Sequence, residues 1–383
     1  MASKSLRPLV AANKLLSNPT LLRERAAADG YLYFRRLIPR ADVLKVRRDI
    51  LEILRGHGWL GSSNVERDSR SMQSFLDGIQ DHRIPSLSSF DRSSTVVHAC
   101  STDLSGLSSH CGDEPPAEAQ ASSNSHDWPF WLDVQRLISF HAIPHHPTFS
   151  SVLHALFGET PLLHPRHIAR TSFPNCDHRT TPAHQDFPYV QGTQKAWTCW
   201  VPLGDIERVD AGPLLVLPRS HTQFGLRSLV NCPDVGPFVP VSYSESESCG
   251  GWATATSGIK FLSEENVVEE GDQEEYGYQA GDVLMFNCLT VHQAAPNSSQ
   301  AVRLSADYRC QPRSEPCSRR ALTPNWDEQS WEQVYSDWPI DSVAGDLRYY
   351  WTRGAPPLDV VSDERGEDLT WMHASGSMDN YYD

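Results

Sequence analysis

The spacing of apolar residues changes along the chain near residue 158. Before that point it is helical. In "TLLRERAAADGYLYFRRLIPRADVLKVRRDI" we predict a helix that stops at the Asp29-Gly30 turn, a strand over "YLYFRRLI", and, after Pro39, an amphipathic helix with apolar residues three or four positions apart. Two further helical stripes are predicted in "WPFWLDVQRLISFHAIPHHPTFSSVLHALFGE".

Beyond Gly158 the apolar residues form short runs that turn residues separate. The runs are "PLLHPRHIARTSF", "AWTCWVPLGDI", "PLLVLP", "DVLMFNCLTVHQAA" and "VRLSADYRC". Short strands at close spacing favour a sandwich or barrel over alternating βαβ units. We therefore predict a mainly β fold with flanking helices, an acidic Ser-rich loop over 232–275, and an aromatic segment after Pro324 that packs against the core.

The length allows one large domain or two modest ones, and we expect a single domain over 1–383. It has an N-terminal helical and strand support over 20–57, a β core over 158–312 and a C-terminal extension over 313–383. The segment 61–127, dense in Ser, Gly, Pro and Asn with few large apolar residues, is predicted to be a flexible insertion.

The net charge of the chain limits the kinds of molecule that it is expected to bind. The formal net charge of −15 offers no positive field for nucleic acid or an anionic membrane, so neither is expected as a partner. The N-terminus lacks an apolar signal region and no apolar run reaches about 18 residues, so we expect a soluble, cytoplasmic protein. Nine scattered cysteines without a C-x-x-C pair fit free thiols in a reducing compartment.

The triplet His184-Gln185-Asp186 is the strongest candidate for chemistry. On a strand, positions i and i+2 face the same side, which would place the imidazole and the carboxylate together. His292, at the end of the apolar run "DVLMFNCLTVH", is the candidate third ligand. Two imidazoles and one carboxylate on one face of Fe(II) leave three positions open for a co-substrate and O₂. The helical H-E-x-x-H spacing of many zinc hydrolases is absent.

Arg303 and Ser305 follow His292 on one predicted strand face. A guanidinium fork beside a hydroxyl can receive one end of a dicarboxylate. The alternative is that Arg303 is an ordinary surface residue of the strand.

In this order the motifs resemble a known family. "HQD", "CWVPLGDI", "AGPLLVLPRSH", "GDVLMFNCLTVHQAAPNSS" and Arg303, with the opening "DGYLYFRRLIPRADVLKVRRDI", look like the signature of the phytanoyl-CoA dioxygenase family of Fe(II)- and 2-oxoglutarate-dependent oxygenases. The resemblance covers roughly 20–57 and 130–310. It implies a double-stranded β-helix, or jelly-roll, core, with His184, Asp186 and His292 as iron ligands and Arg303 as the anchor of the distal carboxylate of 2-oxoglutarate.

Further residues near these motifs have expected roles. Trp200 matches a family tryptophan and either walls the co-substrate pocket or is a core aromatic. Gln293-Ala294 stands where the family has a small Gly-Ser pair, which makes Ser305 a substitute hydroxyl for the distal carboxylate, and Arg219 replaces a usual glycine. Arg170 could reach a carboxylate of the substrate or of 2-oxoglutarate, or it could form a structural ion pair.

The function that these observations predict is a dioxygenase. With Fe(II), 2-oxoglutarate and O₂ it would oxidise, most simply by hydroxylation, a small metabolite such as an amino acid or a specialised-metabolism intermediate, and release succinate and CO₂. Two alternatives stay open, a cupin-type metalloenzyme that does not use 2-oxoglutarate and a non-catalytic binding protein. The oligomeric state is not predicted.

Overall fold

The computed structural model describes residues 6–58, 130–174, 180–232, 236–255, 277–325, 329–340 and 343–362. The predicted insertion over 61–127 lies outside these residues. The helices are α1 Pro19–Asp29, α2 Arg40–Gly56, α4 Phe130–Gln135, α5 Ile138–Ala142, α6 Pro147–Phe157, α7 Phe187–Val190, α8 Ser220–Gln223, α9 Tyr243–Ser248, α10 Trp331–Val334 and α11 Val343–Leu347, with 3₁₀ turns at Asn13–Leu15, Ile143–His145, Arg320–Leu322 and Tyr350–Thr352.

The strands are β1 Arg7–Pro8, β2 Tyr31–Phe34, β3 Pro161–Leu163, β4 Ile168–Ser172, β5 Trp197–Pro202, β6 Leu214–Val216, β7 Val230–Cys232, β8 Gly236–Phe238, β9 Ala253–Thr254, β10 Val283–Asn287, β11 His292–Ala294, β12 Arg303–Pro312, β13 Cys317–Ser318 and β14 Val360–Val361. The predicted runs contain β2 to β6, β10, β11 and most of β12, whereas the other strands lie outside them. The helix, strand and helix predicted before residue 58 are confirmed as α1, β2 and α2. Local signals set the bounds of α1. The Asn18 side chain accepts a hydrogen bond from the Leu21 amide, and Gly30 ends the helix in the left-handed conformation.

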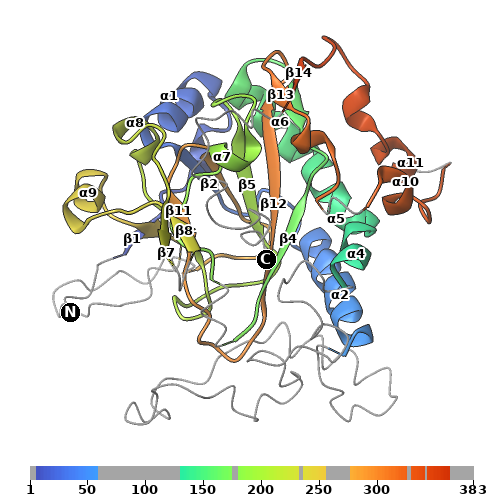
Figure 1. Ribbon diagram of the computed structural model, residues 1–383, viewed down its shortest axis with the longest axis horizontal. Coiled ribbons are helices and arrows are strands. Elements are labelled where there is room, and N and C mark those ends of the chain that lie inside the picture. The colour runs from blue at the N-terminus through green and yellow to red at the C-terminus, as the bar shows by residue number, and fades with distance from the viewer. Residues whose placement is uncertain are drawn as a thin grey trace.

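Two sheets form the centre of the molecule. The large sheet has the strand order β2-β10-β5-β12-β3, with β4 also paired to β12, and every pair in it is antiparallel. The small sheet has the order β1-β9-β6-β11, in which only β1 and β9 run parallel. Figure 1 shows the large sheet in the middle, with α2, α4 and α5 on one side and the small sheet on the other.

The large sheet buries both of its faces. Its outer face packs against the helices in one apolar cluster, to which β5 contributes Cys199 and Val201 and α2 contributes Val46 and Ile50. Its inner face meets the small sheet in a second cluster, in which Trp200 of β5 lies with residues of β6 and β9. Alternate residues of one strand therefore enter different cores, as the period of two requires.

Two sequence predictions are corrected by this topology. His292 does not end the strand that precedes it, because β10 stops at Asn287, a turn follows, and His292 begins β11 in the other sheet. The segment 232–275 is not a plain loop, since its described part contains β8, α9 and β9. Ser242 and Glu245 form a reciprocal capping box at the start of α9, a local signal for a helix.

The aromatic segment after Pro324 packs as predicted. Trp331, Tyr335, Trp338 and Trp351 join Leu162 and Cys317 in a buried cluster. Five cysteines in the described ranges are free and buried, namely Cys199, Cys249, Cys288, Cys310 and Cys317. None of the helices within those ranges is long and apolar enough to cross a membrane.

Candidate metal centre

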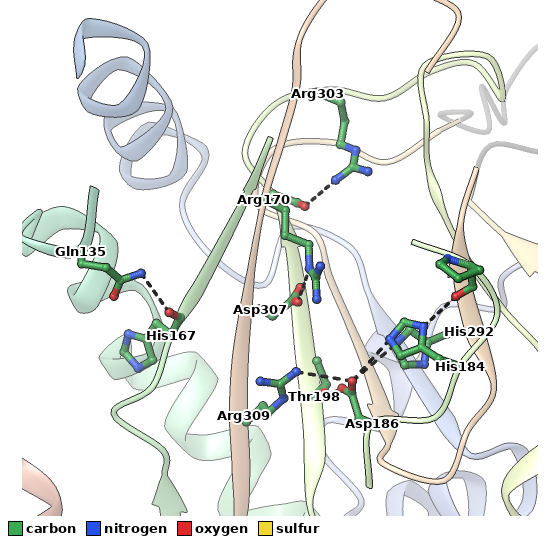
Figure 2. Close-up of polar contacts among 12 residues, drawn as sticks. Gln135, His167, Arg170, His184, Asp186, Thr198, His292, Arg303, Asp307 and Arg309 are labelled. Atoms are coloured by element: carbon green, nitrogen blue, oxygen red, sulfur yellow. Dashed lines mark hydrogen bonds and ion pairs between the residues drawn. The ribbon is translucent and has the colours of Figure 1, made fainter. Parts of the chain in front are cut away.

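Three side chains from distant positions converge between the two sheets. His184 forms an isolated antiparallel bridge with His292, with amide-to-carbonyl distances of 2.9 and 3.0 Å. Asp186 follows two residues later, directly before α7. One potential ligand atom from each of His184, Asp186 and His292 lies within 4.8 Å of the others, and all three residues are buried (Figure 2). The predicted convergence is confirmed, although His184 and Asp186 lie on a bridge and a turn and not on a regular strand.

Backbone carbonyls orient both imidazoles. The Nδ1 atom of His184 lies 2.8 Å from the Pro182 carbonyl, and Nδ1 of His292 lies 3.0 Å from the Thr290 carbonyl. A carbonyl only accepts, so each Nδ1 carries the proton and donates it. The lone pair of each ring is then on Nε2, and these Nε2 atoms lie 3.7 and 3.8 Å from Oδ1 of Asp186. This is the tautomer that a metal-binding histidine needs.

Two side chains hold the carboxylate of Asp186. The Thr198 hydroxyl donates to Oδ2, and Nη2 of Arg309 lies 3.4 Å from Oδ1. Burial alone would raise the pKa of Asp186, but the Arg309 guanidinium and the two imidazoles outweigh it and hold the pKa well below its ordinary value. Burial and the neighbouring His184 lower the pKa of His292 to about 3. The centre therefore combines an ionised carboxylate with a neutral His292.

The donor set fits a metal ion. Nε2 of His184 is buried and has no hydrogen-bond partner in the part of the chain that the structure describes. A buried ring nitrogen without a partner is costly unless something else binds it. Two imidazole nitrogens and one carboxylate on one side are the facial set typical of non-haem Fe(II) oxygenases.

Arg303 and Ser305 lie on the inner face of β12, as predicted. The Arg303 Nε donates to the Gly212 carbonyl at 2.9 Å, and its Nη1 donates to the Ser305 hydroxyl at 2.9 Å. Burial and the nearby Arg170 charge lower the pKa of Arg303 to about 10, which leaves it charged at neutral pH. The guanidinium is thus fixed inside the protein and not on its surface.

Arg170 lies between Arg303 and the three candidate ligands (Figure 2). It comes from β4, in register with Ser305, and its Nε lies 2.6 Å from Oδ2 of Asp307. The sequence left open whether Arg170 contacts a ligand carboxylate or forms a structural ion pair, and the structure shows the ion pair with Asp307, inside the site. The charge of Arg170 also helps to lower the pKa values of His292 and Arg303.

Trp200 lies on the same inner face of β5 as Thr198. Its side chain is fully buried, and its ring centroid lies 4.8 Å from that of Tyr278 in the cluster between the sheets. This is the environment of a core aromatic residue.

Helix α7, directly after the ligand pair, contributes to a cleft. Tyr189 and Val190 line it together with His164, Arg166, Ile168, Arg309, Arg320 and Ala321. Thr193, three residues after Val190, is not among these lining residues, and its hydroxyl donates to Glu315 at 2.9 Å. His164 and His167 lie between β3 and β4 and face different parts of the fold: His164 bonds Gln311 on the inner face of β12, and His167 packs against Tyr308 on the outer face.

Three polar residues of the site were not predicted. Thr198, Asp307 and Arg309 each hold another site residue, either Asp186 or Arg170. Alternate residues of a strand share a face, so Asp307 and Arg309 are expected on the same face as Arg303 and Ser305. For the same reason Thr198 is expected on the same face as Trp200. The signal was therefore in the sequence, but it depended on knowing that the whole strand is buried.

The sequence of the chain matches the model of one protein family. The sequence model of the family described as "Phytanoyl-CoA dioxygenase (PhyH)" matches residues 27–305. No curated protein is similar enough in sequence to count as a match.

Several solved structures resemble the chain weakly. The non-heme alpha ketoglutarate dependent epimerase SnoN from nogalamycin biosynthesis is 15% identical over 78% of this chain and 85% of its own, with a TM-score of 0.37. The non-heme monooxygenase ThoJ in its apo form is 13% identical over 86% and 96%, with a TM-score of 0.44. EctD from S. alaskensis, also in its apo form, is 14% identical over 94% and 92%, with a TM-score of 0.40.

Proposed function

The chain belongs to the phytanoyl-CoA dioxygenase family, and from that premise we propose that it hydroxylates a small-molecule metabolite while 2-oxoglutarate is converted to succinate and CO₂. The family consists of Fe(II)- and 2-oxoglutarate-dependent oxygenases, so iron and 2-oxoglutarate are the cofactors of this enzyme. The observation that carries the proposal is the facial group of His184, Asp186 and His292, with both Nε2 atoms beside one ionised carboxylate.

We also propose a jelly-roll core over 158–312 within a single domain. The two facing sheets support it, because strands next to each other in the sequence, such as β10 and β11, pass from one sheet to the other. The site lies between the sheets, where side chains of β5, β11 and β12 meet.

Each polar residue of the site has a proposed task. His184, Asp186 and His292 would hold the iron, which supplies the activation of O₂ once 2-oxoglutarate is bound. Thr198 and Arg309 keep the Asp186 carboxylate in place. Arg303 and Ser305 would bind the distal carboxylate of 2-oxoglutarate through the guanidinium fork and the hydroxyl. Trp200 closes one side of the chamber as part of the apolar core and limits the entry of water.

Anaerobic addition of Fe(II) and 2-oxoglutarate tests the proposal. The wild type should develop a weak visible charge-transfer band, and His184→Ala and Asp186→Ala should lose both this band and Fe(II) binding measured by calorimetry. His154→Ala is the matched control, because His154 is exposed on α6 and remote in sequence from the site. A folded wild type without the band would refute the assignment, and variants that keep the band would exclude these ligands.

The same experiments can also reveal either of two other functions. Turnover that needs the metal but not 2-oxoglutarate would indicate a cupin-type metalloenzyme. Negligible affinity for Fe(II) in a folded protein would indicate a binding protein without catalysis. Succinate release measured against a panel of amino acids and specialised metabolites then identifies the substrate.

A further inference from the structure

Gln185 lies between the candidate ligands His184 and Asp186 in the sequence, and its side chain is completely buried. We propose that Gln185 is a positioning residue, which holds the ligand-bearing segments at the spacing that the metal needs before the metal binds. The inference rests on the proposed function, since it concerns the same metal centre.

The side-chain amide of Gln185 bonds two other segments of the chain. Its Nε2 donates to the carbonyl oxygens of Gly225, at 2.7 Å, and of Leu289, at 2.6 Å. Its Oε1 accepts from the backbone amide of Arg227 at 2.8 Å. Carbonyls only accept and a backbone amide only donates, so these partners fix the orientation of the side-chain amide. One buried side chain therefore joins three segments.

The bond to Leu289 bears on the third ligand. Leu289 lies in the turn between β10 and β11, and His292 begins β11 three residues later. Thr290, whose carbonyl orients the His292 ring, follows Leu289 directly. Restraining Leu289 therefore restrains both the backbone that leads to His292 and the acceptor of its Nδ1 proton. In this way the turn that carries His184 and Asp186 is tied to the turn that precedes His292.

The bonds to Gly225 and Arg227 attach Gln185 to the loop between α8 and β7. This loop is itself anchored. The Arg227 guanidinium donates to the Pro240 carbonyl at 2.8 Å and pairs with Glu245 of α9. Gln185 thus bonds a segment that is fixed by its own contacts, as an anchor requires.

The chemistry of the centre explains why an anchor is needed. Before a metal binds, the Nε2 atoms of His184 and His292, which carry lone pairs, lie 3.7 and 3.8 Å from the carboxylate oxygen Oδ1 of Asp186. Three acceptor atoms at one point repel each other, so contacts outside the ligand set must hold them together. Thr198 and Arg309 hold the carboxylate, and the bonds described above hold the two histidine segments. Ligands that are held in advance spare the metal the cost of ordering them.

Fe(II) binding by variants of Gln185 tests the inference. Fe(II) alone is titrated by calorimetry into the full chain under anaerobic conditions. Its affinity should be about 10- to 100-fold lower in Gln185→Met, whose side chain has a similar size but cannot form the three hydrogen bonds. Gln185→Asn keeps the amide on a side chain one methylene shorter, so it should lose less affinity. If Gln185→Met does not fold, Gln185→Asn decides the question, and wild-type affinity in the folded variant overturns the proposal.

Gln135→Met is the matched control. Gln135 is also buried, on α4, and its Nε2 donates to the His167 carbonyl at 3.2 Å, away from the three candidate ligands (Figure 2). Both changes replace a buried amide by a thioether, so both should lower the midpoint of urea unfolding. Only Gln185→Met should weaken Fe(II) binding. An equal loss of affinity in the two variants would assign Gln185 to general stability and overturn the proposal.

Hydrogen exchange of the metal-free protein separates this inference from the proposed function. The backbone amides of His184 and His292, which bond each other's carbonyls, should exchange about 10-fold faster in Gln185→Met and at the wild-type rate in Gln135→Met. Unchanged exchange in Gln185→Met would overturn the positioning role. Faster exchange there, with a wild type that lacks the charge-transfer band, contradicts the oxygenase function alone. A wild type with the band and unchanged Fe(II) affinity in Gln185→Met contradict the positioning role alone.

Discussion

The two faces of β12 are buried to the same degree but have opposite chemistry. All ten residues from Arg303 to Pro312 are buried. On the outer face, Leu304, Ala306, Tyr308 and Cys310 pack into the cluster that includes the helices. On the inner face, Arg303, Ser305, Asp307, Arg309 and Gln311 form a polar row between the sheets. Burial of a strand thus contributes stability on one face and chemistry on the other.

The inner face is tolerated because its members have specific partners. Ser305 accepts from Arg303, Asp307 pairs with Arg170, Arg309 contacts Asp186, and Gln311 bonds His164. Such a row stabilises the fold less than an apolar face would, since buried charges lose their hydration. What it provides is a set of charges at fixed positions, which a small dicarboxylate and a metal ion require.

The largest expected contrast between the faces is that between Arg303 and its neighbour Leu304. Arg303→Leu should raise the KM for 2-oxoglutarate by about 100-fold, because the guanidinium that we propose binds the distal carboxylate would be lost. Steady-state kinetics of succinate release would measure it, with calorimetric 2-oxoglutarate binding as an activity-independent check. An unchanged KM would assign Arg303 to structure alone.

Leu304→Ala is the matched change on the outer face. It should lower the free energy of unfolding by about 2–5 kcal/mol through the cavity that it leaves, with little change in the KM. Denaturant titration measures that loss. If Leu304→Ala altered the KM as strongly as Arg303→Leu, the two faces would not be functionally separate.

A smaller contrast is expected on β5. Thr198→Val keeps the shape of the side chain but removes the hydroxyl that donates to Asp186, so Fe(II) affinity should fall about 10-fold. Cys199→Ala, one residue further, alters only the outer cluster and should leave Fe(II) affinity unchanged. Fe(II) titration by calorimetry compares them, and equal affinity of Thr198→Val and the wild type would mean that the hydroxyl does not orient Asp186.

Much of this arrangement follows from local patterns in the sequence. Helix α1 has its cap and its terminal glycine, and β12 has strict alternation, so Arg303 and Ser305 were correctly placed on one face. His184, Asp186 and His292 were brought together correctly because the H-x-D triplet, His292 and Arg303 follow one another in the order of the family's motifs. The helices before residue 158 follow from apolar spacing, and the C-terminal cluster follows from the many aromatic residues after Pro324.

The remainder depends on strand register, which no local pattern determines. Arg309 lies opposite Thr198, and Asp307 lies opposite Trp200, only because β12 and β5 pair in that register.

The backbone conformation of Arg219 is a second feature that the sequence did not predict. Arg219 occupies the position where the resemblance expects glycine and has a left-handed φ of 64°, with its Nε donating to the Cys249 carbonyl at 3.2 Å. Arg219 thus adopts a left-handed conformation that glycine would adopt more readily.

The smallest expected effect concerns His164, which bonds the inner-face Gln311. Burial lowers the pKa of His164 to about 4, against roughly 6.5 in an unfolded chain. Between these values the unfolded chain binds a proton that the folded protein does not, so stability falls as the pH falls, by at most about 1.4 kcal/mol per pH unit for this histidine. His164→Gln should therefore make the decline between pH 6.5 and 4.5 shallower by about one proton, as measured by urea unfolding at several pH values. His154→Gln, a change at an exposed residue of α6, should keep the wild-type slope, and an equally steep decline in His164→Gln would mean that His164 is already protonated in the folded protein.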